Sequence, residues 1–95
     1  MYCVYRDGKV MSPLRQVWET ADESLRNAIG AALQRIDGEL QTDPHHKGES
    51  RPGGTRILFE SPLAVVFAVD EERQLVRVLR VWAFGNGTRK RDRAA

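Results

Sequence analysis

The sequence has almost no cysteine and no long apolar run. Its 95 residues include one cysteine, Cys3, so no disulfide can form within the chain, and there is no CxxC pair. That usage is typical of a reducing compartment, so we expect a cytoplasmic protein with Cys3 as a small buried residue. The longest apolar run, Leu63–Val69, is far shorter than the roughly 18 residues needed to cross a bilayer. Residues 1–7 contain no apolar stretch long enough for a signal peptide.

Metal-binding and nucleophilic motifs are also scarce. The only histidines, His45 and His46, are adjacent, with Asp43 and Glu49 as the nearest carboxylates. Zinc sites use separated ligand pairs or helical spacing, so we expect neither a metal nor another cofactor. Ser50 follows without a GxSxG motif, and the glycines after it lack the Lys-Ser/Thr ending of a phosphate loop. The sequence therefore predicts a solvated loop here.

The net charge of +2 is unevenly distributed. Residues 1–84 contain 11 basic and 12 acidic side chains, whereas residues 85–95 contain four basic and one acidic. A chain of this length forms one domain, which we place at residues 1–84, followed by a basic and disordered tail at 85–95. The excess positive charge thus belongs to the tail and does not mark the domain as a nucleic-acid binder.

The first half of the sequence predicts one strand and two helices. Tyr2–Arg6 is aromatic and β-branched, which favours a strand. Ser12 followed by proline predicts a short helix over Pro13–Glu19. Thr20–Glu23 has the spacing of a capping box and precedes a longer helix that ends at Asp43-Pro44. The apolar stripe of this helix has the spacing i, i+3, i+4, i+7 and consists of Leu25, Ala28, Ile29, Ala32, Leu33, Ile36 and Leu40.

The second half predicts strands. A 13-residue loop over 43–55 precedes strands at Arg56–Glu60, Leu63–Val69 and Gln74–Phe84. The order β-α-α-β-β-β indicates an α+β fold in which two helices pack on one face of an antiparallel sheet. The opposite face then needs a partner or has a binding role.

Regular alternation in the last strand separates its side chains into two sets. Val76, Val78, Arg80, Trp82 and Phe84 share one face under this pattern. Arg77 then points to the opposite face from Arg80, unless a bulge intervenes. Large aromatic residues beside arginine suit stacking and protein contacts, so this set is the predicted binding face. The alternative is that Trp82 belongs to the core and Arg80 lies at a sheet edge.

The remaining candidates are cations near the long loop and in the tail. Arg56 and Arg80 are the candidate catalytic residues. The candidate RNA-binding or target-binding residues are Arg51, Arg56, Arg77, Arg80, Trp82, Phe84, Arg89, Lys90 and Arg91.

Three strand segments carry a resemblance to a known family. Arg56–Phe59, Pro62–Asp70 and Val76–Trp82, in this order of elements, resemble the RelE/ParE superfamily of type II toxins, often labelled plasmid-stabilisation proteins. The resemblance covers residues 1–84. It implies a cognate antitoxin as partner and one of two actions, ribosome-dependent cleavage of mRNA or poisoning of DNA gyrase.

The positions that carry catalysis in the ribonuclease branch depart from that family's pattern. Arg56 matches a basic position, but Ala64 and Phe84 stand where the family usually has basic residues, and no His or Tyr follows. Cleaving RNA without a metal requires a base, an acid and charge stabilisation, and arginine is too basic to transfer protons near neutral pH. We therefore expect a toxin-like protein that acts by binding. The alternatives are an endoribonuclease using Arg56 with Arg51, Arg77 or Arg80, and a non-toxic binding protein of the same fold.

Overall fold

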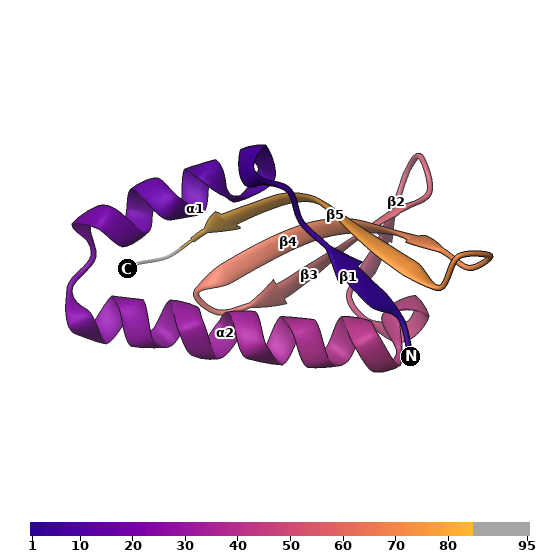
Figure 1. Ribbon diagram of the computed structural model, residues 1–95, viewed down its shortest axis with the longest axis horizontal. Helices are drawn as coiled ribbons and strands as arrows, with labels where there is room; N and C mark the ends of the chain where they lie inside the picture. Colours follow the sequence, from indigo (N-terminus) through magenta and orange to yellow (C-terminus); the bar gives the residue numbers. More distant parts are fainter. Residues whose placement is uncertain (85–95) are drawn as a thin grey trace.

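The computed structural model describes residues 1–84 of the protein as one sheet with two helices packed against it (Figure 1). The predicted tail at 85–95 lies outside the described residues. The elements, in chain order, are β1 (Cys3–Tyr5), α1 (Gly8–Thr20), α2 (Glu23–Thr42), a 3₁₀ turn η1 (Pro44–His46), β2 (Glu49–Arg51), β3 (Thr55–Glu60), β4 (Leu63–Asp70) and β5 (Leu75–Ala83).

The sheet has five strands in the order β1-β5-β4-β3-β2. β1 runs parallel to β5, and every other neighbouring pair is antiparallel. The helices contribute Leu14 and the α2 stripe to one buried cluster with β3, β4 and β5, in which Phe67 is fully buried. The predicted α+β class is confirmed, and so is the helical stripe of α2 except for Ala28, which is exposed. We call the sheet surface that faces away from this cluster the outer face.

Both helices begin at a different residue from the one predicted. α1 starts after Asp7, whose carboxylate accepts a hydrogen bond from the Val10 amide at 2.8 Å, so the predicted start at Ser12 and Pro13 is wrong. α2 starts after Asp22, which accepts from the Leu25 amide at 2.8 Å. In each case an aspartate satisfies an amide that the first turn leaves free. The predicted capping box at Thr20 does not form.

The predicted loop over 43–55 contains regular structure. η1 follows α2 directly, and β2 pairs with β3 through Glu49, Ser50 and Arg51. Gly48 makes the connection with a positive φ of 70°, and a Cβ there would lie 2.1 Å from the Ile57 carbonyl oxygen. Only glycine fits that approach. A loop of 13 residues without structure is therefore the wrong description of this segment.

A β-bulge interrupts β5. Val66 pairs with Arg80 and Phe67 pairs with Val78, so Leu79 has no partner on β4. One extra residue in a strand shifts every later side chain to the opposite face relative to regular alternation.

The bulge changes which side chains share a face. Val78 and Val81 are both buried against the helices, although they are three positions apart and regular alternation would place them on opposite faces. Arg77 precedes the bulge, Arg80 and Trp82 follow it, and all three lie on the outer face. The predicted grouping of Arg80 and Trp82 with Val78 is wrong, because the alternation is not regular.

The capping assignment of α2 gives a direct test. We expect Asp22→Ala to lower the free energy of unfolding by about 1 kcal/mol, because the Leu25 amide loses its acceptor. Thr20→Ala should change it by less than about 0.5 kcal/mol, since its hydroxyl only donates to the Val17 carbonyl. Urea denaturation of both variants measures this, and a larger loss at Thr20 would contradict the assignment.

Candidate functional site

The outer face places two arginines and a tryptophan on one strand. Directly paired residues share a face, and Arg77 pairs with Ala68 while Trp82 pairs with Ala64. The β4 residues at these positions are small, so they leave the long β5 side chains uncovered. Arg77 and Arg80 are exposed and Trp82 is half-buried.

Arg80 and Trp82 form a single unit. The Arg80 guanidinium carbon lies 5.0 Å from the centre of the Trp82 ring, within the range of a cation–π interaction. The pair holds a positive charge against a flat apolar surface. Such a unit can bind a carboxylate or phosphate and an apolar group side by side.

Two phenylalanines extend this surface. Phe59 and Phe84 contact each other edge to face with their ring centres 5.7 Å apart, and they are 53% and 38% exposed. Phe59 pairs with Ala64, which also pairs with Trp82, so these two aromatic residues lie on the two strands that flank β4. Rings of this size exposed together are unusual on a protein without a partner.

The start of α1 borders the site. Lys9, Val10 and Pro13 face the bulged segment of β5 across a hollow of about 330 Å³ that Arg80 and Trp82 also line. A second hollow, of about 260 Å³, lies along β4 and β5 and includes Arg77 and Asp70 in its wall. Leu79 lines both hollows because the bulge turns it outward.

Tyr5 is a site residue that the sequence reasoning did not identify. It is 53% exposed and pairs with Arg77 through the parallel contact of β1 with β5. Residues 5 and 77 are far apart in sequence, so no local pattern indicates the contact. Lys9 was overlooked because the helix was predicted to start at Pro13, five residues after its actual start at Gly8.

Arg56 and Arg51 do not join this site. Arg56 pairs with buried Phe67 and so faces the helices, where its guanidinium donates to the carbonyls of Lys47 at 2.8 Å and Gly48 at 3.0 Å. Arg51 is exposed on β2, three strands away from β5, or roughly 14 Å. The structure therefore does not bring Arg56 together with Arg80. The remaining candidates, Arg89, Lys90 and Arg91, lie outside the described residues.

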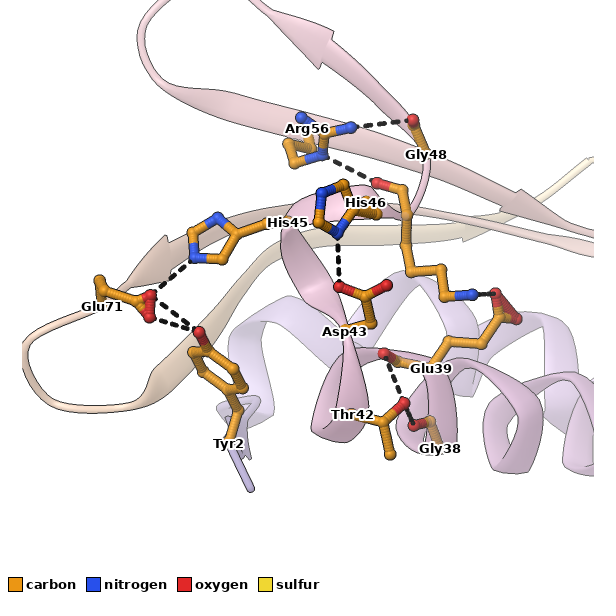
Figure 2. Close-up of polar contacts among 11 residues, drawn as sticks. Tyr2, Gly38, Glu39, Thr42, Asp43, His45, His46, Gly48, Arg56 and Glu71 are labelled. Carbon is orange, nitrogen blue, oxygen red and sulfur yellow. Dashed lines mark hydrogen bonds and ion pairs between the residues drawn. The ribbon is translucent and has the colours of Figure 1, made fainter.

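The histidines belong to a separate cluster at the end of α2 (Figure 2). His45 contacts the Glu71 carboxylate at 3.0 Å, and the Tyr2 hydroxyl donates to the same carboxylate. His46 contacts Asp43 at 2.7 Å. Glu71, in the β4–β5 turn, thereby contacts both the residue that precedes β1 and the turn η1. Within residues 1–84, no group of three or more His, Cys, Asp or Glu side chains is arranged to hold a metal ion.

Hydrogen bonding shifts the titration of this cluster. The Tyr2 hydroxyl, followed by His45, holds the pKa of Glu71 below its ordinary value. The same Glu71 contact raises the pKa of Tyr2, because ionising the phenol would remove the donated proton. Cys3, predicted to be buried, is exposed at the sheet edge because β1 is the outermost strand.

Comparison with known proteins identifies the fold. A chain of the toxin–antitoxin complex RelBE2 from Mycobacterium tuberculosis is 20% identical, with a TM-score of 0.64 over 86% of this chain and 90% of that chain. The isolated E. coli RelE toxin is 15% identical, with a TM-score of 0.58 over 95% of this chain and 88% of that chain. This chain has the fold of the RelE/ParE superfamily.

This fold is the one that the resemblance of the three strand segments implied. A conserved hypothetical protein of Helicobacter pylori also matches, at 13% identity and a TM-score of 0.50, over 87% of this chain and 94% of that chain. No family model and no curated protein matches the sequence. None of the helices described is long and apolar enough to span a membrane.

The Glu71 cluster predicts a pH dependence of stability. The pKa of Glu71 is lower in the folded state than in the unfolded state. Its contribution to folding stability is therefore fully present above the unfolded-state pKa and is lost as the pH falls through the folded-state pKa. We expect the Glu71→Gln variant to have a lower free energy of unfolding than the parent near neutral pH. On acidification, the free energy of unfolding of this variant should fall by less than that of the parent.

Glu72→Gln is the matched control, because Glu72 lies in the same turn and has no contact with Tyr2 or His45. Urea denaturation at about pH 7 and about pH 3 compares the three proteins. Identical pH dependence in the parent and the Glu71 variant would show that the cluster does not contribute to folding.

Proposed function

We propose that the chain is the toxin-like component of a type II toxin–antitoxin pair and that it acts by binding through its outer face. The observation that carries the proposal is the cation–π pair of Arg80 and Trp82 on an exposed sheet surface, in a chain with the fold of the RelE toxin. The partner that covers this face is a protein, either the antitoxin or the cellular target.

Binding fits the chemistry of the outer face better than catalysis does. Arg77 and Arg80 can neutralise charge but cannot exchange protons near neutral pH. The histidines, which could exchange protons, form their contacts with Glu71 and Asp43 at the end of α2. The cations of the outer face and the histidines are therefore in different places, whereas RNA cleavage needs charge stabilisation and proton transfer together.

The composition of the face is typical of a protein interface. Tryptophan, arginine and other aromatic residues dominate the energy of such interfaces, where they fill pockets on the partner. Phe59 and Phe84 supply apolar anchors beside the Arg80–Trp82 pair, and Lys9 adds positive charge at the rim. A partner with acidic side chains flanking apolar ones would match this surface.

An antitoxin partner rests on the likeness to the RelBE2 complex, in which a chain of this fold is part of a toxin–antitoxin assembly. An antitoxin that covers the outer face would block the Arg80–Trp82 pair directly. Neutralisation and target binding would then compete for the same side chains.

A second candidate is an RNA-cleaving enzyme acting at translation. The observation in its favour is the pairing of Tyr5 with Arg77, which places a phenol beside a guanidinium on the outer face. This candidate predicts new mRNA ends after induction of the chain, and their loss in a Tyr5→Phe, Arg77→Ala variant. Unchanged mRNA ends would exclude it.

The proposal predicts growth arrest that depends on the outer face. Inducing the chain alone should arrest growth, and co-expression with the product of the adjacent reading frame should relieve the arrest and yield a co-purifying complex. An Arg80→Ala, Trp82→Ala variant should weaken that complex at least tenfold, since hot-spot residues cost about 2 kcal/mol or more each.

Arg73→Ala is the matched control, because Arg73 is exposed on the β4–β5 turn and, among residues 1–84, its guanidinium forms an ion pair only with Asp70, at 3.8 Å. It should arrest growth and bind as the parent does. No growth defect and no complex would overturn the proposal, and binding without arrest would identify a non-toxic binding protein of the same fold.

A further inference from the structure

β2 is the edge strand at the end of the sheet opposite β1, and no strand in residues 1–84 pairs with its outer edge. Within residues 1–84, β2 pairs only with β3, and its three residues are exposed. A free edge of this kind can accept a strand from another chain unless charge or shape prevents it. The side chains of β2 therefore determine which strand can pair with this edge.

The charges of β2 are complementary to those of a second copy of itself. The strand reads Glu49-Ser50-Arg51, with opposite charges at its two ends. When two such strands pair antiparallel about Ser50, each Glu49 lies opposite the other copy's Arg51. Both side chains point to the outer face, because Glu49 pairs with Ile57 and Arg51 pairs with Thr55 on β3.

Other arrangements of the same two strands lose this match. A parallel pairing in register sets each Glu49 beside the Glu49 of the other copy, which is unfavourable. A shift of one residue sets Glu49 against Ser50 and leaves both charges without a partner. Pro52 has no N–H, so it ends the ladder after three residues. The sequence thus specifies one symmetric register.

Neither Glu49 nor Arg51 forms an ion pair within the described part of the chain. Among residues 1–84, the ion pairs join other side chains, and Glu49 and Arg51 take part in none of them. Oppositely charged side chains that face each other across two strands favour pairing, and the symmetric register forms two such pairs.

We infer that β2 is a self-association edge at which two copies of this chain pair antiparallel, centred on Ser50, through reciprocal Glu49–Arg51 ion pairs. The two five-stranded sheets then form one sheet of ten strands, with both outer faces on the same side. A three-residue edge covers much less than the roughly 1,000 Å² of a stable interface, so the dimer is weak. This inference is independent of the proposed function.

The test is a set of charge reversals followed by sedimentation equilibrium on the full chain. The parent should show a rising average mass up to about 1 mM protein, as expected for weak association. Glu49→Arg places positive charge at both ends of β2 and Arg51→Glu places negative charge at both, so each variant alone should dissociate at least tenfold more readily. An equimolar mixture of the two should regain the mass of the parent dimer, because each positive end then faces a negative one.

Glu72→Arg and Arg73→Glu are the matched controls, since they change the net charge equally on the β4–β5 turn. Both should associate as the parent does. Circular dichroism confirms that each variant keeps its secondary structure. A monomeric parent at the highest concentration, self-association of either single variant, or a monomeric mixture would each overturn the inference.

Discussion

One extra residue in β5 decides which side chains the sheet presents to solvent. Without a bulge at Leu79, Arg80 would point with Val78 into the core, where a charged guanidinium has no partner and a high desolvation cost. With the bulge, Val81 fills that core position and Arg80 joins Arg77 outside. Core packing and site geometry are thus consequences of the same irregularity.

The bulge also links the site to α1. It turns Leu79 outward, toward the hollow that Lys9 and Pro13 border, and it places Arg80 beside that hollow. α1 begins at its Asp7 cap shortly after β1, and β1 pairs with β5. The first turn of α1 therefore stays close to β1, beside β5. Lys9, the Arg80–Trp82 pair and the bulged Leu79 consequently border the same hollow.

Local patterns predicted those parts of the fold that depend on local physics. The apolar stripe of α2 and its end at Asp43-Pro44 follow from helical periodicity and from the backbone restriction before proline. The β4 strand follows from its continuous apolar run. The helix starts were misplaced because several capping residues compete within a few positions, and only the packed structure selects Asp7 and Asp22.

The candidate site depended on contacts that no local pattern contains. The pairing of Tyr5 with Arg77 joins residues at opposite ends of the domain. The short strand β2 lies between glycines and has no apolar alternation, so its sequence is typical of a loop. The side of the sheet on which Arg80 lies depends on one bulged residue. Regular alternation allows for a bulge as an exception but does not predict its position.

The shared face of Arg77, Arg80 and Trp82 depends on the register between β4 and β5, and solution NMR measures that register directly. Cross-strand nuclear Overhauser contacts should join Phe67 with Val78 and Val66 with Arg80, and Leu79 should have no directly opposed partner on β4. A regular ladder, in which Phe67 faces Leu79, would remove the bulge. It would also contradict the shared face of Arg77, Arg80 and Trp82.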